Sequence, residues 1–158
     1  MIPFEVGVIS DTHGLLRPEA IEALRGSELI VHAGDVGNAD VLERLRAIAP
    51  TVAVRGNVDT GAWAAALPAT EVVEVEQVHL YVLHDISTLD LDPKAAGFAA
   101  VIYGHSHRPS AEVRNGVLYL NPGSAGPRRF ALPIAVARLQ VVGAHVSHEI
   151  VELLHKGT

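Results

Sequence analysis

The first half of the chain alternates short apolar runs with amphipathic segments. Apolar runs rich in β-branched residues lie at residues 4–9, 28–32 and 51–54, and each predicts a buried strand. The segments between them, residues 18–24 and 39–49, predict helices, and a proline lies in the first turn of the first one. This β-α-β-α-β order is typical of a parallel sheet with helices packed on its faces.

The second half of the chain predicts hairpins. Residues 71–76 alternate charged and apolar side chains, and the apolar run at residues 78–83 follows closely. A helix is expected near residues 93–96, before another buried strand at residues 99–103. Two more pairs of strand segments flank the turn dipeptides Asn-Gly and Gly-Ala: residues 112–114 with 117–120, and residues 133–142 with 146–153. We therefore expect an α/β fold with two sheets, in one domain over residues 1–158.

The charge and composition of the chain argue against several classes of function. The formal net charge is −6, from 12 Lys and Arg against 18 Asp and Glu, so a basic face for stable nucleic-acid binding is not expected. Cysteine is absent, which excludes disulfides and thiolate metal ligands. No apolar stretch approaches the roughly 18 uninterrupted residues of a membrane span, and the N-terminal residues do not resemble a signal peptide. We expect a cytoplasmic protein that does not bind membranes.

Residues of metal-ligand type follow most of the predicted parallel strands. The loops at these strand ends carry Asp11, His13, Asp35, Asn57, Asp59, His84, His105 and His107. Binding sites in open α/β sheets form beyond the carboxyl ends of the strands, so the fold would bring these side chains to one edge. Alternate residues of an extended segment point the same way, which suits the Asp-x-His and His-x-His pairs.

The ligand types favour two metal ions rather than one. Carboxylate, imidazole and amide-oxygen ligands together suit Mn, Fe, Zn, Ni or Co. Seven ligands (the set without Asp59) exceed what one catalytic ion with open positions needs, and suit two ions about 3.5–4 Å apart with a bridging carboxylate. Two such ions carry a charge of about +4, so the site would attract phosphate although the chain is acidic. Two alternatives stay open: His84 as a core histidine and Asp59 as a turn residue.

The motifs DTHG, GDVGN, GNVD, GHSH and NPGS, in this order, resemble those of the calcineurin-like metallophosphoesterases, in particular their small phosphodiesterase branch. The resemblance implies an α/β/β/α sandwich with a dinuclear metal site between the sheets. It implies that Asp11, His13 and His107 bind one ion, that Asn57, His84 and His105 bind the other, and that Asp35 bridges. It also implies in-line attack on phosphorus by a hydroxide held between two divalent ions, with Mn expected first and Fe, Zn, Ni or Co as alternatives.

Two positions depart from the family pattern. Many members have a histidine after the Gly-Asn pair that assists the leaving group, whereas Val58 and Asp59 follow here. Asp59 is our candidate for that catalytic role, with water as the alternative. The family's usual His-Gly-His run is replaced by His84, Asp85 and Ile86, which brings a carboxylate toward the phosphate and removes a donor.

Two functions are compatible with these residues. The first is a metal-dependent phosphoesterase, a phosphodiesterase by preference, acting on a small phosphoester. The second is a protein-binding scaffold on the same fold, similar to the phosphoesterase-like subunit of retromer. A ligand-competent residue at every metal position favours the enzyme, because a scaffold has no need to keep all seven. Exposed hairpins would allow a homodimer.

Overall fold

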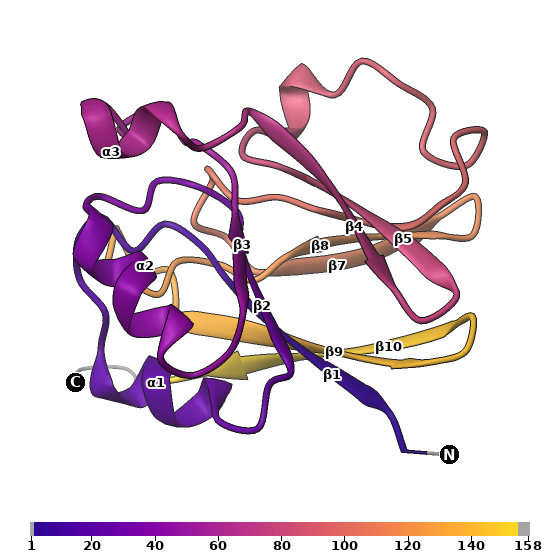
Figure 1. Ribbon diagram of the computed structural model, residues 1–158, viewed down its shortest axis with the longest axis horizontal. Coiled ribbons are helices and arrows are strands. Elements are labelled where there is room, and N and C mark those ends of the chain that lie inside the picture. The colour runs from indigo at the N-terminus through magenta and orange to yellow at the C-terminus, as the bar shows by residue number, and fades with distance from the viewer. Residues whose placement is uncertain (1, 155–158) are drawn as a thin grey trace.

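Two five-stranded sheets pack face to face in the computed structural model, which describes residues 2–154 (Figure 1). The first sheet has the order β10-β9-β1-β2-β3, with parallel pairing among β1, β2 and β3 and antiparallel pairing of β9 with β1 and β10. Its strands are β1 Phe4–Ile9, β2 Leu29–His32, β3 Thr51–Ala53, β9 Ala135–Val142 and β10 His145–Glu152. Helices α1 (Pro18–Leu24) and α2 (Ala39–Arg46) connect the parallel strands, as the sequence pattern predicts.

The second sheet has the order β4-β5-β6-β8-β7. The three central strands are parallel, and each edge strand forms an antiparallel hairpin with its neighbour. The strands are β4 Thr70–Val75, β5 Val78–Leu83, β6 Phe98–Ile102, β7 Ser110–Arg114 and β8 Val117–Asn121. The turn at Asn115 and Gly116 has positive φ at both residues, which matches the right-handed twist of the hairpin.

Burial follows the alternation of side chains along the strands. Val6 and Val8 point from the first sheet into a core shared with Leu80 and Ile102 of the second sheet. The other face of the first sheet packs against the buried side chains of α1 and α2. The outer face of the second sheet is covered by the 3-10 helix η1 (Ile86–Thr88) and the loop after it. The predicted sandwich of two mixed sheets is confirmed, and its outermost layer is thin.

One local prediction is wrong, and one short helix is missing from the predictions. Residues 93–96 form a turn and not a helix, because Asp92 Oδ1 accepts hydrogen bonds from the backbone N–H groups of Lys94 and Ala95 and a glycine with positive φ follows at Gly97. The short helix α3 (Ala62–Ala65) was not predicted. No helix among residues 2–154 is both long and apolar enough to cross a membrane.

Candidate metal centre

The ligand-type residues gather where strands of both sheets end. The loops after β1, β2 and β3 bring Asp11, His13, Asp35 and Asn57, and the segments after β5 and β6 bring His84, His105 and His107. Within the described residues, two groups of side chains have ligand atoms that all lie within 4.8 Å of one another. They are Asp11 with His13 and His107, and Asp35 with His84 and His105. The prediction that strand ends bring these residues together therefore agrees with the geometry.

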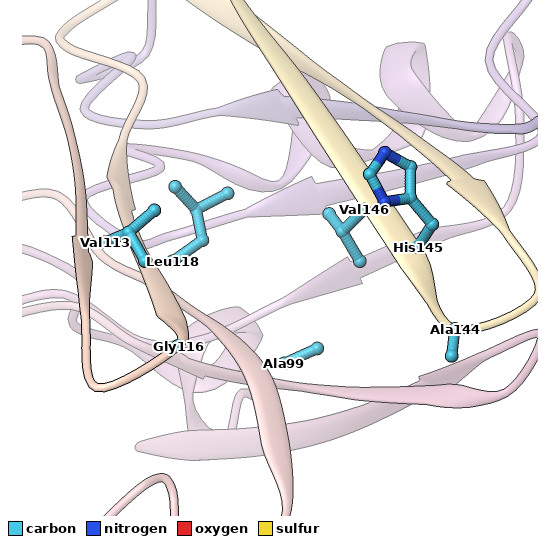
Figure 2. A pocket seen from close by; sticks show the side chains of 7 residues that line it. All are labelled: Ala99, Val113, Gly116, Leu118, Ala144, His145 and Val146. Atoms are coloured by element: carbon cyan, nitrogen blue, oxygen red, sulfur yellow. The ribbon is translucent and has the colours of Figure 1, made fainter.

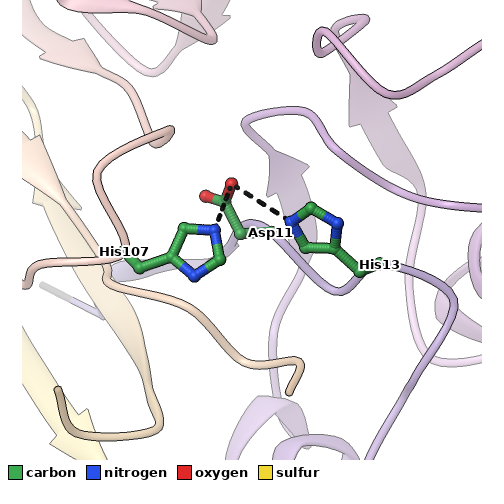
Figure 3. A group of neighbouring side chains, drawn as sticks. All are labelled: Asp11, His13 and His107. Atoms are coloured by element: carbon green, nitrogen blue, oxygen red, sulfur yellow. Dashed lines mark ion pairs between the residues drawn. The ribbon is translucent and has the colours of Figure 1, made fainter. Parts of the chain in front are cut away.

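The first group converges on one oxygen of Asp11 (Figure 3). Asp11 Oδ1 lies 3.3 Å from His107 Nε2 and 3.9 Å from His13 Nε2. The other oxygen, Oδ2, accepts hydrogen bonds from Ser10 Oγ (2.6 Å) and from the His105 backbone N–H (3.1 Å). Asp11 Oδ1 and His13 Nε2 are buried and have no hydrogen-bond partner. Buried polar atoms without partners are rare, and a cation between them would satisfy both.

The second group is built around His84. His84 Nδ1 lies 2.8 Å from the carbonyl oxygen of Ala33 and donates to it, so loss of the proton from Nε2 would leave that lone pair free for a metal. Nε2 lies 3.2 Å from Asp35 Oδ2 and 3.1 Å from Asn57 Oδ1. His105 Nδ1 lies 3.3 Å from the same Asn57 oxygen. Two imidazoles, one carboxylate and one amide oxygen therefore face a common point, as borderline divalent metals require.

Asp35 lies between the two groups. Its Oδ2 is 3.6 Å from His13 Nε2 in the first group and 3.2 Å from His84 Nε2 in the second, while Oδ1 accepts a hydrogen bond from the Val58 backbone N–H. Burial acts to raise its pKa, but the hydrogen bonds from His84 and Val58 outweigh burial and lower the pKa to about 2. Burial lowers the pKa of His13 despite the nearby carboxylates. The pKa of His84 is raised, because Asp35 and Asp11 outweigh its burial.

Five of the seven candidate ligand residues have a left-handed backbone. Asp11, His13, Asp35, His105 and His107 have φ between 48° and 72°, a region that non-glycine residues seldom occupy. The extended geometry expected for the Asp-x-His and His-x-His pairs is therefore wrong: tight turns, and not pleated strands, aim these side chains. Strained backbone of this kind concentrates at functional sites. The sequence contains no direct signal for it beyond the neighbouring glycines.

A buried network of hydrogen bonds holds the loop that carries Asp11 and His13. The Gly34 backbone N–H donates to His32 Nδ1 (3.1 Å), so His32 carries its proton on Nε2 and donates it to Thr12 Oγ1 (3.0 Å). Thr12 in turn donates to the carbonyl of Val36 (2.7 Å). Complete burial lowers the pKa of His32 to about 4. Thr12 and Ser10 were not predicted as site residues, because neither has ligand chemistry.

Asp59 lies beside the ligands and not among them. Its Oδ2 accepts hydrogen bonds from the backbone N–H groups of Val36 (3.1 Å) and Gly56 (2.9 Å), and its Oδ1 accepts from Gly37 (2.9 Å). Its side chain is buried. The carboxylate therefore joins the loop that carries Asp35 to the loop that carries Asn57. Its predicted role in leaving-group protonation stays a prediction.

A small pocket of about 240 Å³, drawn in Figure 2, is lined by none of the ligand residues. It is lined mainly by apolar residues, near the start of β6 and the turns of the β7–β8 and β9–β10 hairpins: Ala99, Val113, Gly116, Leu118, Ala144, His145 and Val146. It contains one imidazole and no carboxylate, so it offers none of the chemistry found at the ligand groups.

The family model of the calcineurin-like phosphoesterase superfamily domain matches residues 4–144 of the chain. The chain belongs to this superfamily. The resemblance in five sequence motifs is thereby confirmed over most of the chain. Members of this superfamily use divalent metals, and the two ligand groups are where this phosphoesterase would hold them.

Relatives of this calcineurin-like phosphoesterase carry related names. A probable metallophosphoesterase from Methanothermobacter thermautotrophicus is 34% identical over 92% of this chain and 91% of its own. Phosphodiesterase YfcE from Escherichia coli strain K12 is 30% identical over 73% of this chain and 76% of its own. Vacuolar Protein Sorting 29 from Cryptosporidium parvum has the same fold, with a TM-score of 0.78 at 18% identity, covering 96% of this chain and 98% of that one.

Proposed function

We propose that this protein is a metal-dependent phosphodiesterase that holds two divalent ions, with manganese as the first candidate. The ions would supply a hydroxide for in-line attack on phosphorus and would neutralise charge on the phosphate. In this proposal Asp11, His13 and His107 hold one ion, and Asn57, His84 and His105 hold the other. The unpartnered buried atoms of Asp11 and His13 support the presence of a cation. The name of the E. coli relative supports the choice of a phosphodiester.

The position of Asp35 carries the proposal. Its Oδ2 lies within 3.6 Å of a ligand nitrogen of each group, so a single carboxylate can contact both ions. Its low pKa keeps it ionised at neutral pH. The protein's own contribution is to fix this carboxylate: the Val58 backbone N–H holds Oδ1 and leaves Oδ2 directed between the groups.

The test compares Asp35→Asn with Asp40→Asn, an exposed carboxylate in the first turn of α2. Each protein is stripped with a chelator and reloaded with Mn²⁺, and metal content and hydrolysis of bis(p-nitrophenyl) phosphate are measured. We expect two ions per chain in the parent and in Asp40→Asn. Asp35→Asn should lose metal and at least about 100-fold in turnover, since the bridging charge contributes several kcal/mol. Full turnover by the metal-free parent would contradict the mechanism.

A protein-binding scaffold is the second candidate, favoured by the close fold likeness to Vacuolar Protein Sorting 29. Turnover in the same assay separates the two, because a scaffold would not hydrolyse the diester even if it bound metal. The complete ligand set, with unpartnered atoms facing one another, supports the enzyme.

A further inference from the structure

Asp85 lies at the open rim of the second ligand group. It directly follows His84 and is the N-cap of η1: its Oδ1 accepts hydrogen bonds from the backbone N–H (3.0 Å) and the hydroxyl (2.8 Å) of Ser87. Its other oxygen, Oδ2, lies 3.9 Å from His105 Nε2. The side chains of Asp85 and His105 are 34% and 48% exposed. One carboxylate oxygen is therefore fixed by the turn, and the other faces the outer edge of a candidate metal ligand.

The ring of His105 separates this carboxylate from the second ligand group. Nδ1 faces Asn57 Oδ1 on the inner side, and Nε2 faces Asp85 on the outer side. The solvent-exposed side of the second ligand group therefore carries a fixed negative charge beside His105. The carboxylates of Asp11 and Asp35 are buried, whereas the side chain of Asp85 is partly exposed to solvent.

We propose that Asp85 makes the site selective for phosphodiesters over phosphomonoesters. This inference rests on the proposed phosphodiesterase function and names the residue that sets its substrate charge. A diester carries one negative charge, whereas a monoester carries close to two above its second pKa near 6. The fixed charge of Asp85 repels the second negative charge of the monoester. At a partly exposed site, one extra unit charge at this range corresponds to about a three- to tenfold effect on kcat/KM.

The salt dependence of this selectivity is a second signature. Charges that face solvent are screened over about 10 Å at 0.1 M ionic strength and over about 3 Å at 1 M. Selectivity that comes from Asp85 should therefore shrink as salt is added. Selectivity that comes from the shape of the site would not change in this way.

The test substitutes Asp85→Asn, which removes the charge and keeps an oxygen that can cap η1. The matched control is Asp92→Asn, because Asp92 also caps a turn of the same loop, through the N–H groups of Lys94 and Ala95. The Mn²⁺-loaded proteins are assayed at about pH 8 on p-nitrophenyl phosphate and bis(p-nitrophenyl) phosphate, at low salt and at about 0.5 M salt. Metal content is measured alongside.

We expect the monoester-to-diester ratio of kcat/KM to rise about three- to tenfold in Asp85→Asn at low salt, and less at high salt. The ratio should stay unchanged in Asp92→Asn. An unchanged ratio in Asp85→Asn, with diester hydrolysis intact, overturns the selectivity and leaves the proposed function standing. If monoester and diester hydrolysis fall equally in Asp85→Asn and metal is lost, the selectivity is overturned as well, because Asp85 would then act only by holding His105. No turnover of either ester by the parent overturns the proposed function and the selectivity with it.

Discussion

At the scale of single residues, Asp59 supports the ligands without being one of them. The two ligand groups contain six of the seven expected ligands, and Asn57 contacts His84 and His105. Asp59 instead accepts hydrogen bonds from the backbone. Its three donors belong to residues 36, 37 and 56, and only the packing of two loops brings them to one carboxylate.

Substitution of Asp59 distinguishes a structural role, in which its carboxylate holds two loops together, from acid catalysis. In Asp59→Asn one oxygen is replaced by an amide that cannot accept, so a buried backbone N–H loses its partner, at about 1–3 kcal/mol of unfolding free energy. We expect that loss in urea unfolding, with weaker metal binding at the Asn57 side. If Asp59 only holds the two loops together, the ratio of parent to variant rates stays constant across diesters of rising leaving-group pKa. A ratio that grows with leaving-group pKa would instead show that Asp59 protonates the leaving group.

At the scale of elements, the loops that follow the strands decide the site. The hydrophobic pattern placed every strand within a few residues, because buried runs and turn residues are local signals. It could not give the left-handed backbone of the ligands or the thin layer over the second sheet, since both depend on tertiary contacts. The loop after β2 shows this dependence: Gly34, with φ of +103°, leaves room for the ring of His84 from the other sheet.

Alanine at Gly34 should displace His84. A Cβ there would lie 2.7 Å from His84 Nδ1, the atom that bonds to Ala33. Gly97→Ala is the matched control, because Gly97 also has positive φ (+85°) but an added Cβ would meet no atom within 4 Å. Both variants should lose about 1 kcal/mol of stability from the strained backbone. Only Gly34→Ala should lose affinity for one ion, by at least about tenfold in Mn²⁺ titrations; equal affinities in the two variants would contradict this placement of His84.

At the scale of the whole molecule, the site joins the two sheets. Asp11, His13, Asp35 and Asn57 extend from the first sheet, and His84, His105 and His107 from the second. Each ligand group combines residues from both sheets, although the motifs are spread over about a hundred residues of sequence. Neither group can therefore form until the two sheets have packed together. The positions of the strand ends predict that these residues gather, and the family resemblance divides them between two ions, but neither gives which atoms face one another. The packing of the two sheets also buries ionisable side chains, so the free energy of unfolding should depend on pH.

The stability of the metal-free protein should fall as pH falls, and His32 should account for a defined part of the loss. Its pKa is lowered to about 4 in the folded protein, against 6.5 when unfolded, because it is completely buried. Below pH 6.5, His32 is protonated in the unfolded chain but stays neutral in the folded chain, which favours unfolding. The contribution of His32 to the free energy of unfolding is therefore full above pH 6.5 and declines toward pH 4. Between pH 8 and pH 5 the loss is about 2 kcal/mol. His13, with a lowered pKa, acts in the same direction, whereas His84, with a raised pKa, stabilises the fold at low pH and loses that contribution as pH rises.

Comparison of variants isolates His32 from these other histidines. Unfolding free energies are measured in urea with a chelator at pH 5 and pH 8, for the parent, for His32→Gln, and for His148→Gln at an exposed position of β10. His32→Gln should be less stable than the parent at pH 8, because the bond from the Gly34 N–H is lost. Its difference between the two pH values should be smaller than that of the parent by about 2 kcal/mol, while His148→Gln should follow the parent. If the parent and His32→Gln lost stability in parallel, the imidazole of His32 would have to accept its proton inside the fold, and the buried network beneath the metal centre would be bonded differently from the arrangement described above.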